Sequence, residues 1–90
     1  MVAYSFPMRV RVLYFAILKD VFGREREELD LPAGSSVSAL LEVLRERGVA
    51  AGNVWGSIAV AVNQEYAQAG VELKDGDEVA LLPPVSGGAR

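Results

Sequence analysis

The stretch from residue 37 to residue 47 is the main segment in which apolar side chains recur at helical spacing. They fall at positions i, i+3, i+4 and i+7, on Val37, Leu40, Leu41 and Leu44. Charged residues fill the opposite side, a serine in the turn at 32–36 can cap the first amides, and Gly48 is expected to end the helix in the left-handed conformation. A helix with one apolar stripe packs on one face of a sheet, so the rest of the chain is expected to supply that sheet.

Four other segments have the patterns of strands. Residues 8–15 alternate, which places Val10, Val12 and Tyr14 on one face of the sheet. The other face of this strand carries Arg9, Arg11, Leu13 and Phe15. Residues 25–31 are interpreted as an edge strand whose charge run is a solvated face. Residues 57–62 and 78–82 are the remaining two strands, with turns at 63–65 and 73–77.

The connecting segments are short. Residues 16–22 have apolar side chains at helical spacing and indicate a helix of one or two turns, with Gly23 as its stop. Residues 49–56 are expected to be irregular. Trp55 is interpreted there as a cover on the edge of the core rather than as a residue that stacks on a ligand.

The order strand, strand, helix, strand, strand predicts an α+β fold. The connection through the helix is a crossover, and its right-handed form is expected to bring the returning strand parallel to, and next to, the first strand. The expected fold is a mixed four-stranded sheet with one main helix on one face, which is the ubiquitin-like β-grasp arrangement. We assign it to residues 1–82, with residues 1–7 as a candidate flexible extension and residues 83–90 as an extended C-terminal tail.

Composition restricts the function. The chain has 90 residues and neither cysteine nor histidine, which argues against thiolate or zinc–thiolate chemistry and removes the commonest general base. An independent enzyme is therefore not expected. The net charge of −3 argues against nucleic-acid binding. The sequence has no apolar run of about 20 residues and no secretory signal, so a soluble cytoplasmic protein is expected.

The C-terminal residues read as a segment that reaches outward. Pro83 and Pro84 cannot donate to a sheet and favour an extended backbone, so pairing should stop after Leu82. Gly87 and Gly88 have no Cβ and can enter a narrow channel. An extended segment from Pro83 to Gly88 spans roughly 20 Å. The alternative is a frayed end without a function.

Three apolar residues fall outside the set that faces the helix. They are Phe15, Tyr66 and Leu82. A group of large apolar side chains on an otherwise wet sheet face is a candidate partner surface, and two of them stand at strand ends beside the exit of the tail. The alternative is incidental scatter, which is common for single exposed apolar residues.

Several motifs together resemble the small subunit of molybdopterin synthase, the MoaD family of sulfur-carrier proteins. They are Val12-Leu13-Tyr14-Phe15-Ala16, the segment 60–66, the segment 73–80 and Pro83-Pro84-Val85-Ser86-Gly87-Gly88. The resemblance covers residues 8–88. Thiamine-pathway sulfur carriers share the fold and the Gly-Gly end, but they look shorter and lack the Pro-Pro-Val-Ser sequence before it.

The resemblance implies that sulfur is carried on the carboxyl group of Gly88. An E1-like enzyme adenylates this carboxyl with ATP and Mg²⁺, and a sulfurtransferase or sulfide donor converts the acyl-adenylate to a thiocarboxylate. The carrier itself binds no cofactor and no metal. The tail, consisting of Pro83, Pro84, Val85, Ser86 and Gly87, inserts into the large synthase subunit, which supplies the catalytic groups. Phe15, Tyr66 and Leu82 match positions that dock the large subunit and, alternately, the activating enzyme, so a hetero-oligomer without nucleic acid or membrane is implied.

The sequence departs from the family pattern after Gly88, where Ala89 and Arg90 follow. As written, Gly88 has no free carboxyl group. Trimming before activation is favoured over loss of the carrier function or an artificial extension. Three alternatives to a molybdopterin sulfur carrier stay open: a ubiquitin-like protein modifier, a carrier for thiamine or thiolated tRNA, and a binding module with an inert tail.

Overall fold

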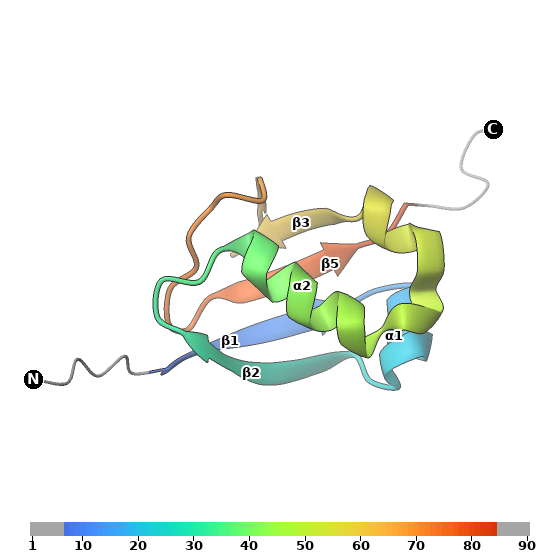
Figure 1. Cartoon of the computed structure of the whole chain (residues 1–90), viewed down its shortest axis with the longest axis horizontal. Helices are drawn as coiled ribbons and strands as arrows, with labels where there is room; N and C mark the ends of the chain where they lie inside the picture. Colours follow the sequence, from blue (N-terminus) through green and yellow to red (C-terminus); the bar gives the residue numbers. More distant parts are fainter. Residues whose placement is uncertain (1–6, 85–90) are drawn as a thin grey trace, which may run out of the picture.

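A computed structural model of the chain describes residues 7–84. It is a mixed sheet covered on one face by helices (Figure 1). The elements in chain order are β1 (Pro7–Tyr14), α1 (Ile17–Phe22), β2 (Arg26–Pro32), α2 (Val37–Arg47), η1 (Val49–Ser57), β3 (Ala59–Val62), β4 (Glu65–Ala67) and β5 (Glu78–Leu82). Within this part of the chain, no helix is long and apolar enough to cross a membrane.

The sheet has five strands in the order β2-β1-β5-β3-β4. β1 pairs antiparallel with β2 and parallel with β5, and β3 pairs antiparallel with both β5 and β4. The prediction of four strands was therefore wrong, because it left out the short strand β4. The strand after the main helix, 57–62, was expected to lie parallel to β1 and beside it, and this prediction was also wrong. β5 takes that place instead of β3, because its two inward residues, Val79 and Leu81, are fully buried in the centre of the sheet.

The core lies between α2 and the inner face of the sheet. The predicted faces are confirmed: Val10, Val12 and Tyr14 of β1 are buried, and the odd-numbered residues of β1 point outward. α2 contributes the buried residues Val37, Leu40 and Leu44. Its N-cap is Ser36, whose Oγ accepts a hydrogen bond from the backbone amide of Ala39 at 3.2 Å, as the capping prediction requires.

The exit from α2 differs from the prediction. Gly48 has φ −115°, so it is not in the left-handed conformation. A Cβ at this position would lie 2.7 Å from Cζ of Phe22, so the glycine is required by the close approach of an aromatic ring. Residues 49–57, expected to be irregular, form η1, which consists of two short 3₁₀ segments separated by a kink at Gly52 (φ 61°, ψ −126°). Trp55 covers the edge of the core as expected, with its indole Nε1 donating to the carbonyl of Gly48 at 2.8 Å.

β2 is an edge strand, but the interpretation of its charge run as a solvated face is wrong at Glu27. The Glu27 side chain is only 8% exposed. It accepts hydrogen bonds from the Tyr14 hydroxyl and from the guanidinium of Arg47, and Arg24 lies 3.7 Å away. Desolvation opposes ionisation of Glu27, but these hydrogen bonds and positive charges outweigh it and lower the pKa of this carboxyl. Desolvation, together with the bond to Glu27, raises the pKa of Tyr14.

The first residue of the described part bears on the predicted extension at residues 1–7. Pro7 belongs to β1 and stands opposite Pro32 of β2, so it is part of the sheet and not of an extension. A proline is tolerated here because it is the first residue of its strand. The prediction for residues 1–6 lies outside the described residues.

Candidate functional site

The root of the tail is the end of β5. This strand is paired on both sides, with β1 up to Leu81 opposite Tyr14 and with β3 up to Leu82 opposite Ala59. Regular pairing ends there, and Pro83 and Pro84 continue outside the strand, as the two prolines predict. The tail therefore starts from the middle of the sheet. The predictions for Val85, Ser86, Gly87 and Gly88 lie outside the described residues.

The outer face of the sheet changes character along the strands toward this root. Directly paired residues point to the same face, so the register defines rows across the sheet. Far from the tail, the rows hold Asp30 with Arg9, and Glu28 with Arg11 and Glu78. The next row toward the tail begins with Arg26 and continues with Leu13, Ala80, Ala61 and Tyr66. A charged half and a mostly apolar half thus share one face.

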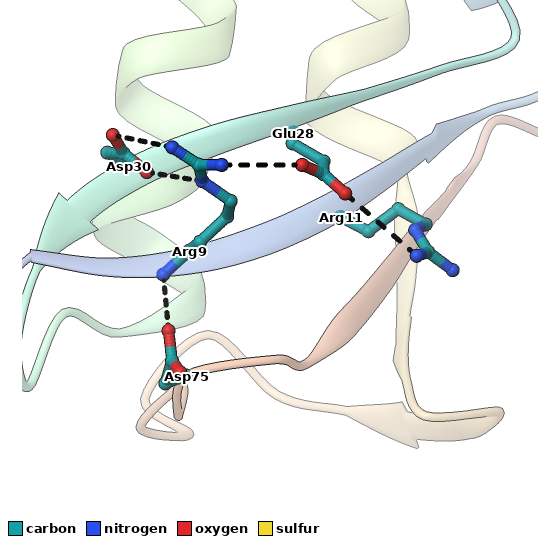
Figure 2. Close-up of polar contacts among 5 residues, drawn as sticks. All are labelled: Arg9, Arg11, Glu28, Asp30 and Asp75. Carbon is teal, nitrogen blue, oxygen red and sulfur yellow. Dashed lines mark hydrogen bonds and ion pairs between the residues drawn. The ribbon is translucent and has the colours of Figure 1, made fainter.

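In the charged half the side chains pair among themselves (Figure 2). Arg9 Nε lies 2.9 Å from Asp30 Oδ1, and Arg9 and Arg11 lie 3.7 and 3.9 Å from the carboxylate of Glu28. The backbone amide of Arg9 also donates to Asp75 Oδ1 at 2.7 Å. The hydrogen bond from Arg9 lowers the pKa of Asp30, and the same bond raises the pKa of Arg9. These are exposed pairs that each stabilise the fold only weakly.

In the apolar half the surface is hollowed beside the root of the tail. The open hollow has a volume of about 540 Å³ and is lined by Phe15, Ala16, Ser57, Ala59, Tyr66, Leu82, Pro83 and Pro84. All three residues predicted as a partner surface meet there, with the first two residues of the tail. Phe15 is 42% exposed and Tyr66 80% exposed, so both rings are open to a partner. We refer to this feature as the docking hollow.

Sequence reasoning missed three lining residues, Ser57, Ala59 and Ala16. The pairing of Ala59 with Leu82 could have placed Ala59 beside the tail had the order β5-β3 been known. Nothing in the sequence marked Ala16 as a lining residue apart from its position directly after Phe15. Within residues 7–84, no cluster of three or more acidic side chains could hold a metal ion. The described part of the site is built for contact between apolar surfaces.

A comparison with known protein families shows to which family the chain belongs. The model of the ThiS family matches residues 12–88. The chain belongs to the ThiS family. The matched range contains the end of β1, the residues of the docking hollow and the tail through Gly88, so the predicted site residues all fall inside the family domain.

The chain is similar over most of its length to proteins named molybdopterin synthase sulfur carrier subunit. It is 40% identical over 83 residues to the molybdopterin synthase sulfur carrier subunit of Chlamydomonas reinhardtii, covering 90% of this chain and 100% of the relative. It is 35% identical to the human protein of that name, covering 89% and 94%. These relatives confirm the resemblance to the MoaD family that the sequence motifs indicated.

Solved structures agree with this placement in the ThiS family. The chain is similar to a protein–protein complex of subunits 1 and 2 of the molybdopterin-converting factor of Helicobacter pylori, with TM-score 0.65, 31% identity and coverage of 90% and 100%. It is also similar to small archaeal modifier protein 1 of Methanosarcina acetivorans, with TM-score 0.75, 29% identity and coverage of 91% and 98%. A ubiquitin from Caldiarchaeum subterraneum shares the fold alone, at TM-score 0.61, 15% identity and coverage of 91% and 99%. The fold is the ubiquitin-like β-grasp, as predicted.

Proposed function

We propose that this chain is the sulfur carrier of a molybdopterin synthase and that it carries sulfur as a thiocarboxylate on Gly88. The observation that supports this most is the match to the ThiS family, which extends to Gly88 itself. The relatives named as molybdopterin synthase sulfur carrier subunits align over nine-tenths of the chain. The sequence contains no cysteine, so a terminal carboxyl is the group available for covalent sulfur.

The chemistry at Gly88 requires two steps after the peptide bond to Ala89 has been hydrolysed. The carboxylate attacks the α-phosphate of ATP and releases pyrophosphate, which leaves an acyl-adenylate. Sulfide then attacks the acyl carbon and displaces AMP, which leaves the thiocarboxylate. We assign ATP, Mg²⁺ and the catalytic groups of these steps to an E1-like activating enzyme. The carrier contributes only the reacting carboxyl and its placement.

The partner that receives the tail is the large subunit of the synthase, within which the thiocarboxylate donates its sulfur to the pyranopterin precursor. The Helicobacter pylori complex pairs subunits 1 and 2 of the molybdopterin-converting factor, and our chain aligns with one chain of that structure over its full length. The docking hollow is the surface we assign to this contact, because Phe15, Tyr66 and Leu82 surround the point at which the tail leaves the sheet. The activating enzyme is expected to use the same surface, so the two partners exclude each other.

Intact-mass measurement tests the proposal directly. Two proteins are compared, one ending at Gly88 and one ending at Arg90, each incubated with the activating enzyme, ATP, Mg²⁺ and sulfide. The protein that ends at Gly88 is expected to gain the mass difference between sulfur and oxygen, and the longer one is expected to stay unchanged. A control that ends at Gly87 separates a requirement for Gly88 from activation of any free terminus. Failure of the Gly88 protein to gain sulfur would contradict the proposal.

The likeness to a small archaeal modifier protein supports a second candidate, in which Gly88 forms isopeptide bonds with lysines of target proteins. The two candidates differ in the product. A modifier gives higher-mass conjugates that disappear when Gly88 is deleted, whereas a carrier gives a thiocarboxylate and a functional synthase. Tagged protein expressed in cells and probed for conjugates distinguishes them.

A further inference from the structure

Ala16 adopts a backbone conformation that suits glycine. It has φ 53° and ψ −130° at the start of a turn that the Leu18 amide closes on the Phe15 carbonyl at 3.0 Å. This is the second position of a type II′ turn, where the positive φ normally selects glycine. The Cβ of an L-residue is strained there, so alanine makes the folded chain less stable than glycine would.

Other left-handed positions in residues 7–84 show how this chain usually meets the requirement. Four are glycines, namely Gly23, Gly34, Gly52 and Gly76. Asn63 and Gln64, the two residues between β3 and β4, have φ 51° and 74°; the Asn63 side chain donates to Asp77 and accepts from the amide of Glu78, which compensates for strain in that turn. The methyl group of Ala16 can form no such bond. The loss of stability caused by the backbone strain at Ala16 therefore needs another explanation.

Core packing does not supply that explanation, because Ala16 is exposed and is not a member of the buried cluster. Ala16 is instead one of the residues that line the docking hollow, together with Phe15 and with Pro83 at the root of the tail. The strained residue therefore lies on the surface assigned above to a partner.

We propose that the Ala16 methyl group is a contact for the partner protein that receives the tail. In this reading the alanine lowers the stability of the free carrier and raises its affinity for a partner surface that is apolar where it meets the hollow. The inference rests on the proposed function, since the partner is the large subunit of the synthase. It adds to that function one residue, Ala16, whose methyl group raises the affinity for the large subunit and takes no part in catalysis.

The substitution Ala16→Gly tests both halves of the inference. Glycine relieves the strain, so the melting temperature of the free carrier should rise. Removal of one methyl group from an apolar contact should weaken binding to the large subunit by about fourfold. Both are measured on the chain that ends at Gly88, by thermal unfolding and by titration calorimetry. Ala33→Gly is the matched control: Ala33 is exposed in the turn at the far end of the sheet, and its substitution should leave affinity unchanged.

The outcomes separate this inference from the proposed function. Unchanged affinity of Ala16→Gly, with normal binding by the unsubstituted chain, overturns the methyl contact alone. A fall in melting temperature for Ala16→Gly also overturns it, because the strain would then be absent. If the unsubstituted chain does not bind the large subunit at all, the proposed function and this inference fail together.

Discussion

The hydroxyl group of Tyr14 donates a 2.7 Å hydrogen bond to Oε1 of Glu27 and so ties β1 to the edge strand β2. Arg47, at the end of α2, binds the same carboxylate at 3.0 Å. Tyr14 also stacks on Phe22 with ring centroids 4.3 Å apart. One enclosed carboxylate therefore joins two strands and the main helix at the end of the molecule where the tail begins.

Replacing Glu27 by glutamine should destabilise the protein and change its response to acid. At neutral pH we expect a loss of about 1–3 kcal/mol, because a charge-assisted hydrogen bond and an ion pair are weakened in a largely buried site. The folded-state pKa of Glu27 is lowered, so its stabilising effect is present above the unfolded value near 4.3 and is lost as pH falls through the folded value. Urea unfolding of both proteins at pH 7 and at pH 3 checks this. A difference that stays constant between the two pH values would contradict it.

Gly48→Ala should destabilise the fold because of a steric clash. The new Cβ would lie 2.7 Å from Cζ of Phe22 and 3.0 Å from Cζ2 of Trp55, and both rings are held by packing. We expect a loss of about 1–3 kcal/mol, as for other overpacked sites. Gly56→Ala is the control in the same segment, since a Cβ there has no neighbour within 4 Å. Equal melting temperatures for the two variants would show that the rings move freely.

Two adjacent left-handed residues in the turn between β3 and β4 should respond in opposite ways to glycine. Gln64 has φ 74°, so Gln64→Gly should stabilise the protein by about 0.4–1 kcal/mol. Asn63→Gly relieves a similar strain but removes the bonds from Asn63 to Asp77 and Glu78, and should destabilise it by roughly 0.5–1.5 kcal/mol. Chemical denaturation gives both values. A stabilised Asn63→Gly would mean that the side-chain bonds contribute nothing.

Tyr66→Ala should weaken binding to the synthase large subunit without loss of stability. Tyr66 is 80% exposed in the free carrier, so truncation of its side chain removes little packing within the fold. An aromatic residue at the centre of an interface commonly contributes about 2 kcal/mol or more, which is a loss of affinity of more than tenfold. Val49→Ala is the control, because Val49 is 71% exposed and lies outside the docking hollow. Equal losses in the two variants would argue against the hollow as the binding surface.

Much of the fold could be predicted from the sequence because its strands and main helix have clear periods. The end strand 78–82 agrees with β5 residue for residue, and the cap of α2 was visible in the sequence. β4 was missed because three residues are too few to show alternation. The sequence of η1 is rich in small residues, so nothing in it marked the two short 3₁₀ segments as helical.

The site was predictable in part. Phe15, Tyr66 and Leu82 could be grouped by exclusion from the core, and the structure brings them together. The inward position of Glu27 could have been found, because Leu29 and Leu31 lie two and four residues after it and point inward. The backbone angle of Ala16 could not, since no residue type near it demands a left-handed turn.

The place of β5 between two partner strands determines how the carrier withstands force. A pull on the tail acts along the axis of β5, whereas its hydrogen bonds to β1 and β3 run largely across that axis. The four paired residues on each side of β5 therefore bear the load together, in shear. A strand peeled from the edge of a sheet would instead lose its hydrogen bonds one at a time. Under the proposed function, in which the tail enters one enzyme and is withdrawn for the next, the tail is thus anchored to a strand that is held on both sides.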